Sequence, residues 1–194
     1  MGISALAPHN RREIEFGRPV LTRRYVDPGP RPSVPNPREA LLRVALEFVR
    51  AASACPGVAR IALIGSLATP KPVPKDVDML VTLEDGMDLD PLATVSRRLK
   101  GRAQSFNLGA DIFLCDRAGR YLGRVCGFRE CHPRARCLAM HCGRRDHLND
   151  DLEVVTLDTS VTLSPAFVLW PEVERRADAP QDVERLLLAP LEGR

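Results

Sequence analysis

The sequence has no apolar run of the roughly 18 to 20 residues that a membrane-spanning helix needs. Its start, MGISALAPHNRREIEF, lacks the apolar core of a signal peptide, and Leu6 does not fit the pattern for myristoylation at Gly2. We therefore expect a cytoplasmic protein with no membrane partner. Six cysteines in that compartment favour thiols or metal ligation over a disulfide framework.

Internal repeats are also absent, and proline is concentrated at the start of the chain. Residues 1–37 hold seven prolines, and proline fixes φ and removes an amide donor, which predicts an extended arm. Beyond it, a chain that is 44% apolar can bury a core. We expect an arm over residues 1–36, a core over 37–120, and a basic segment rich in cysteine and histidine, with the C-terminal elements, over 121–194 packed on that core.

The spacing of apolar residues predicts the secondary structure. Asn36 is a suitable N-cap for a helix that has Pro37 in its first position and ends near Cys55. The other predicted helices are residues 89–99, 166–176 and 182–188, and the predicted strands are residues 58–64, 77–83, 110–114, 121–125 and 152–157. This order predicts an α/β or α+β fold, a mixed sheet with flanking helices.

Three acidic residues and a Gly-Ser turn are the strongest functional signal. Gly65-Ser66 ends one predicted strand, where glycine permits close approach to a ligand and free amides can bind phosphate. Asp76 and Asp78 begin the next strand, and because they are two residues apart their side chains share a face. Their mutual repulsion favours a divalent cation. Asp111, in a later strand, is a third candidate ligand.

This arrangement resembles the nucleotidyltransferase superfamily, which includes DNA polymerase β and small bacterial minimal nucleotidyltransferases. The resemblance covers residues 58–115 and implies transfer of a nucleoside monophosphate from a nucleoside triphosphate to a hydroxyl group of a protein, a tRNA or a small molecule. It implies that Asp76 and Asp78 bind Mg²⁺ or Mn²⁺, and that Asp111 binds the catalytic metal and helps to deprotonate the acceptor. It also implies that Gly65 and Ser66 hold the β and γ phosphates.

The spacer between Ser66 and Asp76 departs from the superfamily pattern. It contains three prolines within Thr69 to Lys75 and leaves little room for the short helix that usually follows Gly-Ser. Lys75 is a candidate phosphate contact, with a solvated loop lysine as the alternative. The segment from Arg97 to Arg145 contains twelve Lys or Arg and three acidic residues, which gives it a net charge of +9. This charge favours phosphate-bearing ligands.

The segment CGFRECHPRARCLAMHC offers a second candidate metal site. Zinc prefers four thiolate or imidazole ligands, although no Cys-x-x-Cys pair is present. The candidate ligands are Cys126, Cys131, Cys137, His141 and Cys142. The alternatives are buried cysteines that pack as small apolar residues and a redox-labile cluster. An inactive nucleotidyltransferase-like scaffold, whose zinc-stabilised basic surface binds nucleic acid, is the alternative function.

Five further residues carry weaker expectations. We expect His147 at the surface and Asp151 in an acidic turn, where a metal role is the weaker alternative. Cys55, Cys115 and Trp170 are expected in the core because they lie beside or within apolar runs.

Overall fold

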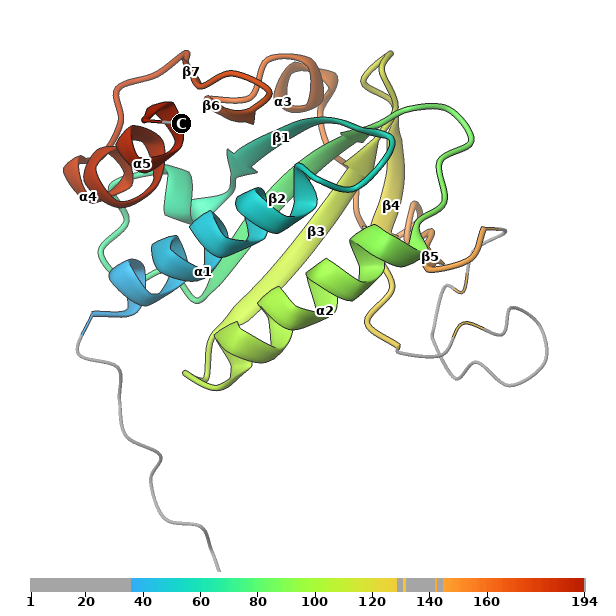
Figure 1. Ribbon diagram of the computed structural model, residues 1–194, viewed down its shortest axis with the longest axis horizontal. Helices are drawn as coiled ribbons and strands as arrows, with labels where there is room; N and C mark the ends of the chain where they lie inside the picture. Colours follow the sequence, from blue (N-terminus) through green and yellow to red (C-terminus); the bar gives the residue numbers. More distant parts are fainter. Residues whose placement is uncertain (1–35, 129–130, 132–141, 143–144, 194) are drawn as a thin grey trace, which may run out of the picture. The chain divides into compact units, whose positions relative to one another are not determined.

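A seven-stranded mixed sheet forms the centre of the computed structural model (Figure 1). The strand order is β5-β4-β3-β2-β1-β6-β7. Only β2 and β3 pair in parallel; all the other neighbouring strands are antiparallel. The strands are β1 (Val58–Ile64), β2 (Asp76–Leu83), β3 (Gly109–Cys115), β4 (Tyr121–Val125), β5 (Leu148–Asn149), β6 (Phe167–Trp170) and β7 (Glu174–Arg175).

The structure describes residues 36–128, 131, 142 and 145–193, which belong to one compact unit of residues 32–194. The predicted arm therefore lies outside the described residues, except for Asn36. Within the described part, helices and a mixed sheet give the α+β class that the sequence predicts. No helix found there combines the length and the apolar character that crossing a bilayer requires.

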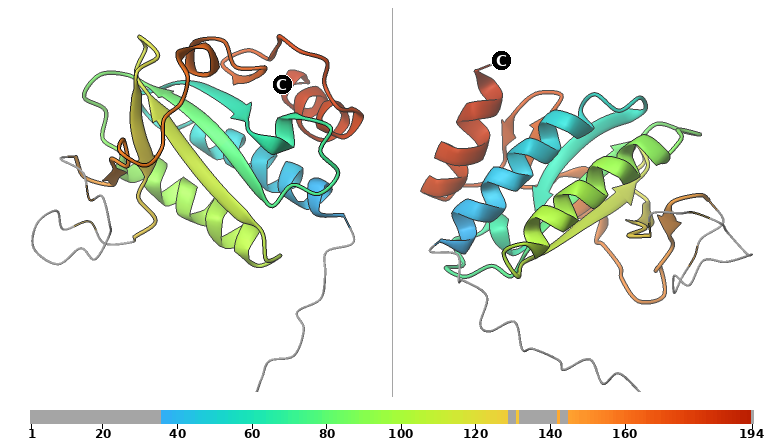
Figure 2. Two further views of the ribbon diagram at one scale, coloured as in Figure 1. Left: turned by 180° about the vertical axis from the view of Figure 1, so that it is seen from behind. Right: turned by 60° about the horizontal axis from the view of Figure 1, so that its bottom comes forward.

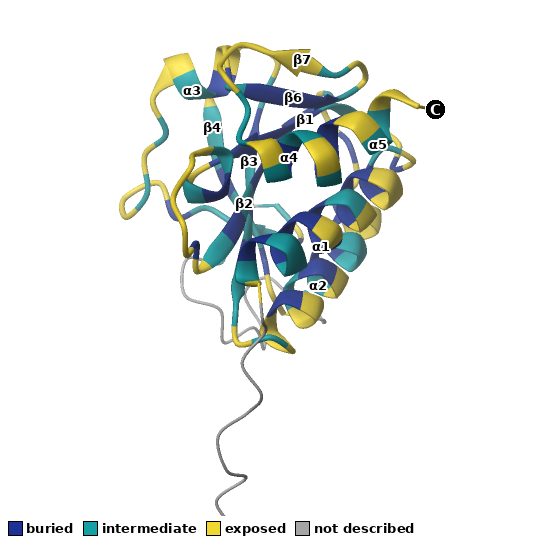
Figure 3. Cartoon of the chain, turned by 90° about the vertical axis from the view of Figure 1, so that its left-hand side faces the viewer, coloured by how far each residue is buried: buried dark blue, intermediate teal, exposed yellow. Residues whose placement is uncertain are grey.

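Two long helices, α1 (Pro37–Ala52) and α2 (Asp90–Gln104), lie side by side over one face of the sheet (Figure 2). Helix α1 begins as predicted, with the Asn36 side chain accepting a hydrogen bond from the Glu39 amide at 3.3 Å. Helix α2 runs one and a half turns beyond the predicted end because Ala103 is buried against the core. The sides of both helices that face away from the sheet carry exposed residues (Figure 3).

The two faces of the sheet differ in how they are covered. The helix-covered face holds the larger core, which includes Ile61, Leu63, Val77 and Met79. The opposite face holds a smaller cluster of Ala62, Ile64, Leu80 and Cys115, against which Leu157 and Val161 of the 150–163 segment pack; α3 (Thr159–Leu163) ends this segment. Because no helix in the described part of the chain covers this second face as α1 and α2 cover the first, polar side chains can lie on it. The buried state of Cys55 and Cys115 agrees with the sequence.

The predicted helix over residues 166–176 is wrong. The chain there forms strands β6 and β7, and a cis peptide bond joins Trp170 to Pro171. The short apolar run FVLW fits either a helix or a strand, and pairing with β1 decides for the strand: Val168 lies opposite Ala62. The predicted C-terminal helix is present but irregular, as α4 (Gln181–Val183), the π-helical η2 (Glu184–Leu188) and α5 (Ala189–Glu192).

The predicted strand over residues 152–157 is also wrong. Its residues favour strands by type, yet the backbone turns there, with the amides of Val154 and Val155 both donating to the Asp151 carbonyl at 2.9 Å. Asp151 is fully buried and held through its side chain. This tertiary anchor overrides the weak local preference of the following residues.

Candidate functional site

The structure brings the three predicted carboxylates together on the more open face of the sheet. The parallel register sets Asp78 beside Asp111 and Asp76 beside Gly109. Because side chains alternate along a strand, Asp76 and Asp78 point away from Val77 and Met79, which are buried in the core. All three aspartates are partly exposed, so a solute can reach them.

The Gly-Ser turn lies directly against this group. Pairing of β1 with β2 sets Ile64 opposite Asp78, so the next residue, Gly65, turns beside the Asp78 carboxylate. Gly65 has φ 70° and ψ −159°, and a Cβ atom at this position would lie 2.1 Å from Asp78 Oδ2. Only glycine combines that backbone with that approach. A 3-10 turn, η1 (Ser66–Ala68), follows.

Ser66 presents an uncommitted hydroxyl at the turn. Its Oγ atom is buried and makes no hydrogen bond with any residue in the described part of the chain. A buried polar atom without a partner costs free energy, so the hydroxyl is suited to a ligand atom. The short helix that the prolines seemed to exclude is present as η1, because it closes at Ala68 before the first spacer proline.

Asp78 is the electrostatic focus of the site. Burial, and after it the neighbouring charges of Asp76 and Asp111, raise the pKa of its carboxyl to about 7, while Arg124 opposes them. Near neutral pH the group is therefore balanced between its protonated and charged forms. A cation bound beside it would favour the charged form.

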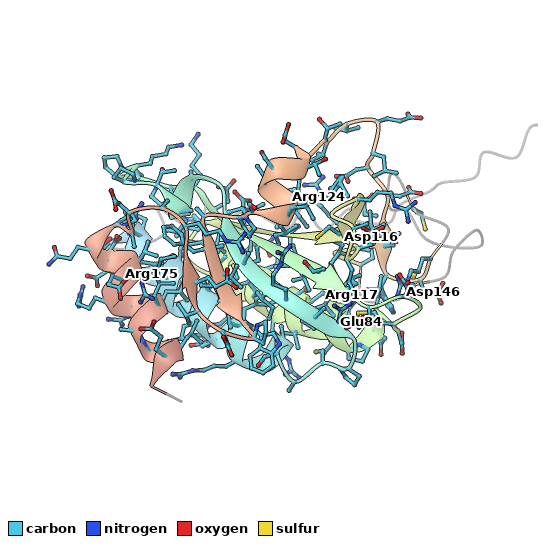
Figure 4. All side chains as sticks on the ribbon, turned by 90° about the horizontal axis from the view of Figure 1, so that it is seen from above. Glu84, Asp116, Arg117, Arg124, Asp146 and Arg175 are labelled. Carbon is cyan, nitrogen blue, oxygen red and sulfur yellow. The ribbon has the colours of Figure 1, made fainter. Side chains whose placement is uncertain are left out.

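Asp111 already has basic partners that the sequence did not single out. Lys100 Nζ lies 3.8 Å from Asp111 Oδ1, and Arg124 Nη1 lies 3.4 Å from Oδ2. Arg124, which comes from β4 and is labelled in Figure 4, also donates through Nε to Asp151 Oδ2 at 2.6 Å. Tyr121 donates to the other Asp151 oxygen at 2.8 Å.

This network has clear electrostatic consequences. Burial and the hydrogen bond to Asp151 raise the pKa of the Tyr121 hydroxyl. Although burial opposes it, the carboxylates of Asp111 and Asp151 raise the pKa of Arg124 above its usual value. Arg124 is therefore a fixed positive charge between a buried carboxylate and the site. Asp151 is a buried anchor, and the sequence offered no pattern that would have identified it.

A divalent cation fits Asp76 and Asp78 better than it fits all three aspartates. Across residues 36–128, 131, 142 and 145–193, no group of three or more His, Cys, Asp or Glu side chains is arranged to hold a metal ion. Mg²⁺, however, is usually bound by one or two carboxylates together with substrate phosphates. The crowded charge at Asp78 and the unpartnered Ser66 hydroxyl match that mode, whereas Asp111 is held by Arg124 and Lys100.

The candidate zinc ligands are only partly described. Cys126 is buried, and Cys131 and Cys142 are half-buried; Cys137 and His141 lie outside the described residues. His147 is a correction: expected at the surface, it is 9% exposed. Its amide donates to Cys131 Sγ at 3.0 Å and its carbonyl accepts from the Cys126 amide at 2.8 Å, and its imidazole Nε2 lies 3.2 Å from Asp90 Oδ1.

Lys75 is exposed, and its backbone rather than its side chain is fixed. Its carbonyl accepts a hydrogen bond from the Gly109 amide at 2.8 Å, which joins the start of β2 to the start of β3. The Lys75 side chain, next to Asp76 in the sequence, is exposed to solvent.

Replacing Gly65 with alanine tests the contact between the turn and Asp78. Gly86 is a matched control, since its φ is 71° against 70° for Gly65 and a Cβ atom there would meet nothing within 4 Å. We expect Gly86→Ala to cost about 1 kcal/mol of unfolding free energy and Gly65→Ala about 3 kcal/mol, because strain and collision add. Equal losses in urea denaturation would contradict the close approach.

Comparison with known proteins adds no assignment: no family model, no curated protein and no solved structure matches this chain. The functional argument therefore rests on the geometry of the carboxylate site.

Proposed function

We propose that the protein is a metal-dependent nucleotidyltransferase that moves a nucleoside monophosphate from a nucleoside triphosphate to a hydroxyl group. The observation that carries the proposal is the meeting of Asp76, Asp78 and Asp111 with the Gly65 turn on one open face of the sheet. The nucleotidyltransferase-like fold is part of the same proposal, and the helix-strand order and the parallel β2–β3 pair support it.

Asp76 and Asp78 would hold Mg²⁺ or Mn²⁺, which when bound neutralises the triphosphate and polarises its reacting phosphate. The turn at Gly65 and Ser66 would bind the β and γ phosphates through backbone amides and the buried hydroxyl. Asp78 must then be ionised, and removal of its proton accompanies binding below pH 7 because its pKa is about 7 in the unliganded protein.

In this proposal Asp111 accepts the proton of the acceptor hydroxyl. The hydroxyl oxygen then forms a bond to the α-phosphorus, the bond from that phosphorus to the bridging oxygen breaks, and pyrophosphate leaves. Lys100 lies near one oxygen of the Asp111 carboxylate and Arg124 near the other, which restrains the orientation of the carboxylate. A protein side chain, an RNA end and a small molecule each offer a suitable hydroxyl, and a cytoplasmic setting suits all three.

Calorimetry tests the proposal without knowledge of the acceptor. Wild-type protein is titrated with a non-hydrolysable nucleoside triphosphate in the presence and absence of Mg²⁺, alongside Asp76→Asn/Asp78→Asn. The control is Asp85→Asn/Asp178→Asn, which changes the net charge equally at two exposed positions. We expect metal-dependent binding in wild type and control, and at least about tenfold weaker binding in the site variant.

Two outcomes would overturn this assignment. One is the absence of metal-dependent nucleotide binding in folded wild-type protein, and the other is equal binding by the site variant and the control. Salt-dependent binding of nucleic acid that ignores Asp76 and Asp78 would instead favour the inactive scaffold with a zinc-stabilised basic surface. That alternative also requires zinc in the purified protein.

A further inference from the structure

Arg38 is a buried arginine whose guanidinium group donates hydrogen bonds to residues far away in the sequence. It stands in the first turn of α1 and is 8% exposed. Nε donates to Asp182 Oδ2 at 2.5 Å and Nη2 donates to Asp182 Oδ1 at 3.0 Å, so the carboxylate of α4 is held by both. This pairing lowers the pKa of the Asp182 carboxyl.

The remaining donors of Arg38 all reach the loop that follows Gly65-Ser66. Nη1 donates to the carbonyls of Thr69 at 2.9 Å and Lys71 at 2.7 Å, and Nη2 donates to the carbonyl of Leu67 at 3.3 Å. One guanidinium group thus fixes three carbonyl oxygens along five residues of chain. These contacts span the end of η1 and the beginning of the spacer.

The spacer needs an external support of this kind. Pro70, Pro72 and Pro74 have no amide hydrogen, so the segment can form few hydrogen bonds within itself. Within the described residues, its local hydrogen bonds come from the Thr69 amide and hydroxyl, which both donate to the Ser66 carbonyl, and from the Lys71 amide, which donates to Thr69 Oγ1. Arg38 satisfies the carbonyls that the prolines leave without partners.

We propose that Arg38 is a positioning residue that holds the phosphate-binding turn in place. Held by Asp182 on one side, it fixes the loop behind Ser66 and so keeps the turn against Asp78. The inference rests on the proposed function for its role in nucleotide binding, but the loop support itself can be measured separately. A lysine cannot replace Arg38, because an ammonium group lacks the planar fork that reaches a carboxylate and several carbonyls together.

The test compares Arg38→Lys, Asp182→Asn and Arg43→Lys. Arg43 lies on the same helix with a side chain that is 71% exposed, so it is the matched control. Amide hydrogen exchange is followed by mass spectrometry in the peptide covering Gly65 to Lys71, with β3 as the internal reference for global opening. The apparent Kd for the Mg²⁺ complex of a non-hydrolysable nucleoside triphosphate is the second measurement.

We expect loop exchange to accelerate at least about tenfold relative to β3 in Arg38→Lys, less in Asp182→Asn, and not in Arg43→Lys. The Kd should rise in the same order. If Arg38→Lys fails to fold, Asp182→Asn still decides the question. Unchanged loop exchange overturns the inference even when nucleotide binds, and equal acceleration in loop and β3 also overturns it. If loop exchange accelerates in Arg38→Lys but the wild-type protein binds no nucleotide, then Arg38 does hold the loop in place and the proposed function is refuted.

Discussion

Replacing Asp78 with asparagine is expected to impair the nucleotidyl transfer proposed above and to stabilise the metal-free protein. Loss of a group outside the ligand set typically costs about 10- to 100-fold in metal affinity or activity, so loss of a ligand should cost at least about 100-fold in transfer. The metal-free variant should nevertheless be more stable than the wild-type protein, because burial and two neighbouring carboxylates oppose the charge on Asp78. Asparagine keeps the shape of the side chain and removes that charge.

The expected difference in stability between Asp78→Asn and the wild-type protein depends on pH. The pKa of Asp78 rises from 3.8 to about 7 on folding, so its stabilising contribution is complete below pH 4 and is lost as the pH rises through 7. The shift corresponds to about 4 kcal/mol, and solvent screening of this partly exposed group reduces it to about 2 kcal/mol. The Tm advantage of Asp78→Asn should therefore grow from near zero at pH 4 to about 4–8 °C at pH 8.

Differential scanning fluorimetry in a metal chelator measures this difference, with the exposed Asp85→Asn as control. The control should differ from wild type by a small amount that does not change across this pH range. An Asp78→Asn protein that is less stable than wild type at pH 8 would contradict the crowding of charge at Asp78. Added Mg²⁺ and nucleotide should reverse the order, since they stabilise only the protein that binds them.

The carboxylate site could be predicted from the sequence because it depends on local rules. Alternation along a strand places Asp76 and Asp78 on one face, and a glycine at the end of an apolar run predicts a turn. The parallel register that sets Asp78 beside Asp111 joins distant segments, yet the helix between the two strands makes parallel pairing the ordinary outcome. Local pattern and common topology together were therefore sufficient here.

The supports of the site could not be predicted, because they join residues that no pattern connects. Arg38 and Asp182 are 144 residues apart, and Arg124 and Asp151 are separated by 27. The charge count was misleading for the same reason. Arg102 and Arg117 form ion pairs with Glu47 and Glu84, which lie outside the basic segment, so the charge of +9 overstates what a ligand meets.

Replacing Arg124 with methionine is expected to cause a large loss of stability. Asp151 is completely buried and receives one hydrogen bond from Arg124 and one from Tyr121. Methionine fills much of the same volume but removes the counter-charge that Arg124 gives the Asp151 carboxylate, and breaking a buried ion pair in this way costs about 3–5 kcal/mol. Because the Arg124 side chain is 28% exposed, we expect about 3 kcal/mol in urea denaturation, the low end of that range.

Arg120→Met is the control for this prediction. Arg120 pairs with Asp116 at 3.0 Å, but its side chain is 78% exposed, so its loss should cost less than about 1 kcal/mol. The double variant Arg124→Met/Asp151→Asn should recover about 1–2 kcal/mol of the loss. The amide carries no charge to bury, and its oxygen can still accept the Tyr121 hydrogen bond. Two results would contradict the prediction: equal losses of unfolding free energy in Arg124→Met and Arg120→Met, or no recovery in the double variant. Either result would mean that Arg124 does not stabilise the buried Asp151 carboxylate, and that their ion pair is not what holds the 150–157 segment against β4.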